Sequence, residues 1–171
     1  LGLTYIPPEL REDHGEFGRA EKGAIPRLIE WSDLKGSLHN HSNWSDGRET
    51  LEEIAAHTHE LGCAYWAITD HSKSSFQANG LDPERLRRQL TEVARINKEF
   101  EKEGSDFRLL TGSEVDIFNE GRLDFDDELL SELDVVVASI HQGLTQSEAE
   151  TTKRLVCAEG KPTVHVLGHL T

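Results

Sequence analysis

Two histidines and a carboxylate lie within eight positions of the segment SLHNHSNWSDG, residues 37–47. His39 and His41 are two positions apart, so on an extended chain their side chains share a face and can bind one cation. Imidazole nitrogen suits zinc, manganese or iron, and a carboxylate extends the choice toward harder ions. Asp46 stands in a turn, where it either bonds its own backbone or contributes an oxygen to the same ion. The segment alone fits both a polar loop and half of a metal site.

The same residue types recur at or near the end of each later segment that is predicted to be a strand. His71 follows YWAITD, Glu114 lies in FRLLTGSEVDI, His141 follows DVVVASI, and His169 follows TVHVLG. A single histidine at a strand end is more often structural, but this repeated register favours a metal cluster. Because a glutamate has two oxygens, Glu114 can bridge two ions. The predicted metal ligands are His39, His41, Asp46, His71, Glu114, His141 and His169.

Other polar residues near these positions are assigned supporting roles. Asp70 and Asp116 are predicted to hold ligands in place, since metal-bound histidines usually need an outer hydrogen-bond partner; Asp70 could equally contact the metal. Arg48 and Lys73 are candidates for contact with a substrate phosphate, and a solvated cation is the ordinary alternative. His165 is expected in the core. The residues assigned to catalysis are His39, His41, Glu114 and His141.

The elements that must position these residues alternate between helices and strands. Thr50 begins a helix through a capping box with Glu53, and Gly62 ends it. Asp82 and Pro83 begin a longer helix, as N-cap and first helical residue. Further helices are predicted over 127–132 and 146–158, and strands over 33–39, 65–69, 107–117, 134–140 and 163–167.

Near-continuous apolar strands between helices indicate parallel strands that are buried on both faces. Polar groups at the strand ends favour a barrel, which gathers those ends at one mouth. Five strands are too few to close a barrel. The predicted fold class is therefore α/β, a distorted βα barrel truncated to about five βα units. Residues 1–30 are interpreted as a connector from an upstream domain, and residues 31–171 as the body.

The composition limits the class of protein. The net charge is −14, whereas a domain that grips nucleic acid with its whole surface is normally basic. The acidity is either a solubility surface or a surface partly neutralised by bound cations. No apolar run approaches the roughly 18 residues of a membrane helix, and two distant cysteines fit a reduced, cytoplasmic protein. The absence of methionine predicts a piece of a longer protein.

The motifs LHNHSNWSDG, AITDHS, TGSEVDI, SIHQG and HVLGHLT, in this order, resemble those of the polymerase and histidinol phosphatase (PHP) domain. The resemblance extends from about Lys35 to the end of the chain. It assigns residues 31–171 to the N-terminal and central part of a PHP metal-dependent phosphoesterase domain. The stretches YIPPELRE, SDGRETLEEIA and TDHSKS look closest to the C-terminal PHP domain of bacterial family X DNA polymerases.

The resemblance implies a distorted, seven-stranded TIM-like barrel that binds up to three zinc or manganese ions and hydrolyses phosphoesters. By position it divides the ligands into three sets: His39, His41 and Glu114; Glu114, His141 and His169; His71 and Asp46. The family completes its site with a late Asp-x-His pair, and this chain ends before such a pair. The resemblance therefore leaves the activity of the chain by itself open.

The expected activity is that of a 3′-5′ exonuclease or a 3′-end phosphatase in DNA repair. Its expected partners are DNA 3′ ends, reached through the parent protein, and an upstream polymerase domain in cis. One alternative is a phosphatase for a small phosphate ester, of the histidinol-phosphatase type. Another is a non-catalytic scaffold domain that metal ions stabilise.

Overall fold

The structure is a computed structural model that describes residues 2–169. The chain forms two compact units, which divide after Leu34. The first unit contains the short helix α1 (Glu16–Glu21). The buried carboxylate of Glu16 accepts the backbone N–H groups of Asp13 and His14. The division lies four residues beyond the boundary expected at residue 30, and a role as connector stays a prediction.

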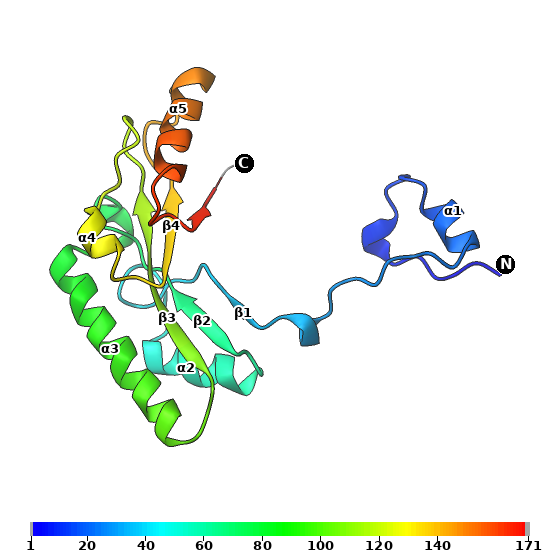
Figure 1. Ribbon diagram of the computed structural model, residues 1–171, viewed down its shortest axis with the longest axis horizontal. Coiled ribbons are helices and arrows are strands. Elements are labelled where there is room, and N and C mark those ends of the chain that lie inside the picture. Colours follow the sequence, from blue (N-terminus) through cyan, green and yellow to red (C-terminus); the bar gives the residue numbers. More distant parts are fainter. Residues whose placement is uncertain (1, 170–171) are drawn as a thin grey trace. The chain divides into compact units, whose positions relative to one another are not determined.

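A sheet of five parallel strands forms the framework of the second unit. The strands are β1 (Gly36–Ser37), β2 (Tyr65–Ile68), β3 (Arg108–Asp116), β4 (Val135–Ser139) and β5 (Val166–Leu167). They are hydrogen-bonded in chain order, and β3 pairs with β2 over residues 108–111 and with β4 over residues 112–116. The sheet curls into half of a barrel with helices between the strands (Figure 1). This arrangement confirms the predicted α/β class and its five βα units.

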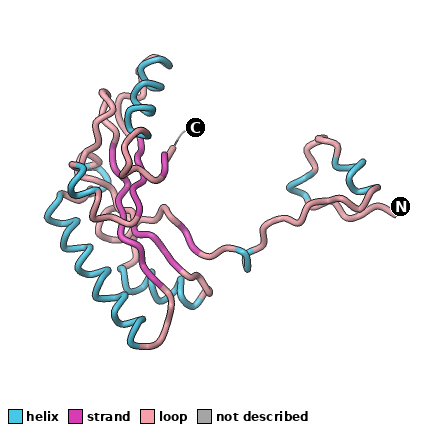
Figure 2. The backbone as a smooth tube through the Cα atoms, in the orientation of Figure 1, coloured by secondary structure: helices cyan, strands magenta, loops and turns pink. Residues whose placement is uncertain are grey.

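Helices connect the strands (Figure 2), and two of them begin at the predicted capping residues. The Thr50–Glu53 capping box is formed at the start of one helix, and Asp82 accepts the N–H of Arg85 at the start of another. Gly62 has a φ of +80°, which favours glycine after a helix end. The helices are α2 (Leu51–Glu60), α3 (Pro83–Lys102), α4 (Asp127–Leu130) and α5 (Glu148–Glu159). Among residues 2–169, no helix combines the length and apolar character that crossing a membrane requires.

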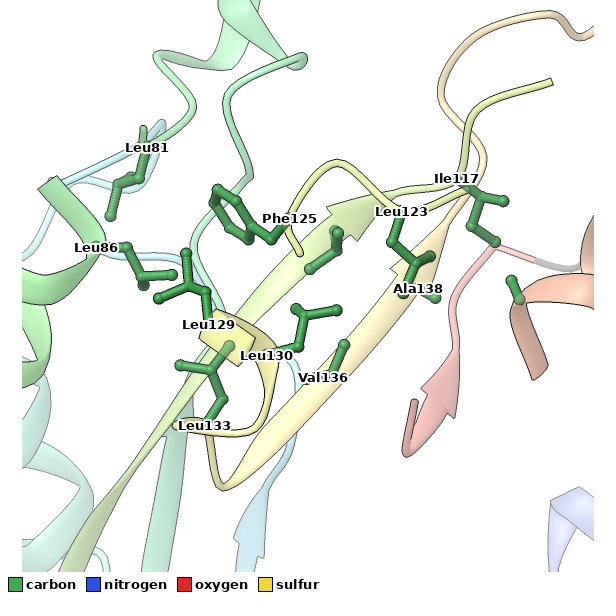
Figure 3. Packing of buried hydrophobic residues seen from close by; sticks show 12 residues of the cluster. Leu81, Leu86, Ile117, Leu123, Phe125, Leu129, Leu130, Leu133, Val136 and Ala138 are labelled. Atoms are coloured by element: carbon green, nitrogen blue, oxygen red, sulfur yellow. The ribbon is translucent and has the colours of Figure 1, made fainter. Parts of the chain in front are cut away.

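The core lies on both faces of the sheet, so alternate residues of one strand enter different clusters. Val136 packs with the leucines of α4 (Figure 3). Val115 of β3 belongs to the same cluster. Val137 packs on the opposite, inner face. Because side chains alternate along a strand, Glu114 lies on the face opposite Val115. The sheet therefore directs the carboxylate of Glu114 into the half-barrel.

Strands β1 and β5 are shorter than predicted, and His165 does not lie in the core. β1 and β5 have two residues each, where 33–39 and 163–167 were expected. The prediction of a core position for His165 is wrong, because its side chain is exposed. Its Nδ1 accepts the backbone N–H of Val136 at 3.1 Å. This bond holds the ring beside β4 rather than in the core.

Candidate metal centre

The chain beyond β1 remains paired to β2 and thereby positions the first two histidines. The N–H of Thr69 donates to the carbonyl of Asn40 at 2.8 Å, and the N–H of Asn40 donates to Oγ1 of Thr69 at 2.9 Å. Asn40 is therefore fixed at the end of β2. His39 and His41, on either side of it, reach the same carboxylate, that of Glu114.

Glu114 lies at the centre of the cluster, and its side chain is 0% exposed. Its backbone is held from both directions, because its N–H donates to Thr69 and its carbonyl accepts the N–H of Ser72. Five imidazoles surround its carboxylate. Three of them face Oε2, which lies 3.3 Å from Nε2 of His39, 3.5 Å from Nε2 of His41 and 3.1 Å from Nδ1 of His71. The other two face Oε1, which lies 3.3 Å from Nε2 of His141 and 2.9 Å from Nε2 of His169.

The donor atoms of this cluster fit a metal ion. Both oxygens of Glu114 are buried without a hydrogen-bond partner in the described part of the chain, as are one ring nitrogen each of His39, His41 and His71. Buried polar atoms are rarely left unpaired, because losing water without a replacement costs free energy. Imidazole nitrogens and carboxylate oxygens are the usual ligands of zinc and manganese. Divalent ions would thus provide the partners that these atoms lack.

Asp46 faces the cluster from its rim, where its side chain is 48% exposed. Its Oδ1 lies 3.8 Å from Nδ1 of His41, and its Oδ2 lies 3.6 Å from Nε2 of His71. These two rings are stacked, with their centroids 4.4 Å apart. The structure therefore brings Asp46 toward the histidines, and its role as a metal ligand stays a prediction.

The donors fall into three overlapping groups, each with its atoms within 4.8 Å of one another: His39, Glu114 and His169; His41, Asp46 and His71; His71, Glu114 and His141. This grouping differs in part from the three sets that the family resemblance implies. His41 faces Asp46 with one nitrogen and Glu114 with the other. It is therefore placed between two possible ion positions instead of belonging only with His39.

Asp116 makes the contact expected of an outer partner. Its Oδ1 lies 2.7 Å from Nδ1 of His141, which turns the other ring nitrogen toward Glu114. Its Oδ2 accepts the hydroxyls of Ser74 at 2.6 Å and Ser75 at 2.7 Å. The carboxylate of Asp116, and then that of Glu114, raises the pKa of His141 to about 10. In the metal-free protein this ring is protonated at neutral pH, and an ion must displace that proton.

The charge of the central carboxylate is set by opposing effects. Burial raises the pKa of Glu114, but the neighbouring His141, Ser139 and His71 outweigh it, so the pKa lies well below its usual value. Burial, followed by the nearby His71, lowers the pKa of His41. At neutral pH Glu114 is therefore ionised and His41 is neutral, which are the forms that bind a cation.

Asp70 supports the site differently from the prediction, because its carboxylate bonds no histidine in the described structure. It accepts hydrogen bonds from Ser42, Ser45 and Gln89 instead. These bonds fix the loop that joins His41 to Asp46. Gln89 lies on the apolar stripe of α3 between Leu86 and Val93, and a polar residue on such a stripe is the signal that could have identified it.

The same loop requires a glycine at position 47, because the chain there folds back closely onto the backbone of His41 and Ser42. A Cβ at this position would lie 2.4 Å from the carbonyl oxygen of His41 and 2.7 Å from that of Ser42. We expect Gly47→Ala to lower the free energy of unfolding by about 1–3 kcal/mol, as overpacking does, and to weaken metal binding. Thermal unfolding and metal titration would measure both. Gly18→Ala is the control, since a Cβ there meets nothing within 4 Å; equal effects of the two variants would contradict the prediction.

Arg48 and Lys73 are both exposed. Neither forms an ion pair with any residue between 2 and 169. Their charges are therefore free to meet an anion near the cluster, and their contact with a substrate phosphate stays a prediction.

Comparison with known proteins agrees with this geometry. The family model of the PHP domain matches residues 37–166. The chain is also 44% identical over 171 residues to the DNA polymerase/3′-5′ exonuclease PolX of Bacillus subtilis (strain 168). The alignment covers 100% of this chain and 29% of that relative, so the chain spans less than a third of the relative's length. Because the family model covers most of the chain, the protein belongs to the PHP domain family of metal-dependent phosphoesterases.

Proposed function

We propose that this chain is the hydrolytic part of a DNA-processing enzyme and acts on DNA 3′ ends, as a 3′-5′ exonuclease or a 3′-end phosphatase. The observation that carries the proposal is the buried carboxylate of Glu114 among five imidazoles. The relative named as a polymerase and 3′-5′ exonuclease supports the substrate class. A polymerase domain in cis would supply DNA affinity that a chain of net charge −14 lacks. Such an activity belongs to DNA repair in the cytoplasm.

Zinc or manganese is the proposed cofactor, because imidazole and carboxylate ligands suit both ions. Divalent ions at this centre would neutralise phosphate oxygens and lower the pKa of an attacking water. Side chains of the protein position the ligands around these ions. Glu114 offers one oxygen to each side of the cluster, and Asp116 orients His141 through its Nδ1. His169 is 55% exposed, so the centre is open to a substrate on that side. Arg48 and Lys73 follow Asp46 and His71 by two residues, and we propose that they contact a second phosphate.

Labelled DNA tests this proposal directly. The protein, loaded with manganese or zinc, is incubated with 5′-labelled strands that end in a 3′-hydroxyl or a 3′-phosphate, and in parallel with histidinol phosphate. Shortening of the strand or release of the terminal phosphate supports the proposal. Protein that binds manganese but leaves both DNA ends intact contradicts it, and turnover of histidinol phosphate alone would favour the small-molecule phosphatase.

An exposed aromatic residue beside the cluster favours DNA over a small ester. Phe76 is 83% exposed. It follows Ser75, whose hydroxyl oxygen lies 3.4 Å from Nδ1 of His141. Stacking of bases on aromatic side chains is a common way to hold a single strand. We therefore propose that the base of the terminal nucleotide stacks on Phe76.

Phe76→Ala is expected to raise the KM for a DNA 3′ end about 5- to 150-fold, because stacking contributes about 1–3 kcal/mol per base. Turnover of p-nitrophenyl phosphate, which reports on the metal centre, should not change. Leu61→Ala removes another exposed apolar side chain, at the end of α2, and is the matched control. A loss shared equally by both substrates would argue against stacking.

A further inference from the structure

Arg154 of α5 is a buried cation that the proposed function does not use. Its side chain belongs to the fully buried set, at 2% exposure. Nη1 donates to the carbonyl of Gln142 at 2.8 Å and to Oε1 of Gln146 at 3.0 Å, and Nη2 donates to the carbonyl of Ile117. Its Nε is buried and has no partner within the described residues. The two Nη groups therefore make all of its hydrogen bonds.

The two backbone carbonyls that Arg154 binds have a common position relative to the metal centre. Ile117 directly follows Asp116, and Gln142 directly follows His141. The register of β3 with β4 ends at the pair of Asp116 and Ser139, so His141 lies beyond the strand. The guanidinium thus links the two chain segments at the point where the sheet no longer holds them together.

Apolar packing between the segments after β3 and β4 does not take the place of the hydrogen bonds of Arg154. The side chain of Ile117 points into the core cluster at the end of β3 (Figure 3), which leaves its carbonyl for Arg154. The segments after β3 and β4 border a cavity of about 260 Å³, which Asp116, Gln142 and Arg154 help to line. Hydrogen bonds, rather than apolar contacts across this space, must set the distance between the segments.

The acceptors of Arg154 are all neutral oxygens, and within residues 2–169 it forms no ion pair. Asp116 and Glu120 attract the guanidinium from beyond ion-pair distance, but burying a charge outside an ion pair costs free energy, so bulk alone would be supplied better by an apolar residue. What arginine adds is a rigid planar fork that reaches several acceptors at once. We infer that Arg154 is a positioning residue, which fixes Asp116 and His141 relative to each other through the carbonyls of Ile117 and Gln142.

Arg154→Gln removes the charge and the fork. We expect the affinity for Mn²⁺, measured by calorimetry, to fall about 10- to 100-fold, the usual effect of losing support behind a ligand. In the chelated protein, the NMR signal of the His141 Nδ1–H, which Asp116 protects from exchange, should weaken or vanish. Lys153→Gln removes an exposed cation from the same helix and should change neither. If Arg154→Gln does not fold by circular dichroism, Arg154→Lys, which keeps a cation, is used and should lose about tenfold in affinity.

A double variant separates positioning from general stabilisation. If Arg154 acts by positioning Asp116 against His141, its loss should not matter once Asp116 no longer holds His141. The double variant Arg154→Gln/Asp116→Asn should then bind Mn²⁺ no more weakly than Asp116→Asn alone. Full additivity, or an unchanged affinity and NMR signal in the single variant, would overturn the inference. The inference rests on the proposed metal centre but not on its substrate. DNA left intact by the wild-type chain would contradict the proposed function, while the metal and NMR results would still decide the role of Arg154.

Discussion

Replacing Glu114 by glutamine is expected to lower kcat for phosphoester hydrolysis about a thousand-fold or more. The two oxygens of this carboxylate face five imidazoles, and its side chain is 0% exposed. Glutamine keeps the shape but removes the negative charge on both sides of the cluster. Stabilisation of transition-state charge by bound ions is worth several kcal/mol, and about 4 kcal/mol corresponds to a thousand-fold.

Single-turnover rates and metal analysis of the purified Glu114→Gln protein would measure this effect. Glu120→Gln makes the same chemical change at an exposed carboxylate that pairs with Arg122, and should leave the rate within about twofold. Retention of full activity and metal content in Glu114→Gln would show that the imidazoles bind ions without the bridging carboxylate. The central role assigned to Glu114 would then be wrong.

Chelation of the metal is expected to lower the melting temperature by about 5–10 °C. An ion present at a hundred times its Kd stabilises the folded state by about 2.7 kcal/mol, and each kcal/mol shifts the melting temperature of a domain this size by about 2–4 °C. The physical reason is the set of unpartnered buried atoms of Glu114, His39, His41 and His71, which an ion would satisfy.

Thermal unfolding followed by circular dichroism, with and without EDTA, measures this shift. Adding back Mn²⁺ or Zn²⁺ in excess should restore the original midpoint. Glu114→Gln provides the internal comparison, because a protein that no longer binds the bridged ions should respond less to the chelator. A wild-type midpoint that does not move on chelation would mean that the cluster contributes nothing to stability through metal.

The sequence predicted the parts of this molecule that depend on local signals. The cap at Thr50, the N-cap at Asp82 and the apolar runs of β2 to β4 are short-range patterns, and two helices and three strands follow from them. The convergence of His39, His71 and Glu114 also followed, because parallel strands bring their ends to one edge.

The outer hydrogen bonds could not be predicted in the same way. Asp70 bonds Gln89, nineteen residues away, and Asp116 bonds Ser74 and Ser75 from another loop. Such pairings depend on how loops fold over the strand ends, for which periodicity gives no information. The lengths of β1 and β5 were overestimated for a related reason. Residue types alone do not show where a neighbouring strand stops pairing, whereas strand assignment needs a paired neighbour at each residue.

The sequential order of the sheet has a consequence for how the centre is built during synthesis. Each strand pairs with the one made just before it, so a growing chain can add strands without waiting for a distant partner. The ligands around Oε2 of Glu114, from His39 to His71, all leave the ribosome before those around Oε1. The ligands on the Oε2 side of the cluster are therefore all synthesised once β3 is made, whereas the Oε1 side waits for His141 and His169.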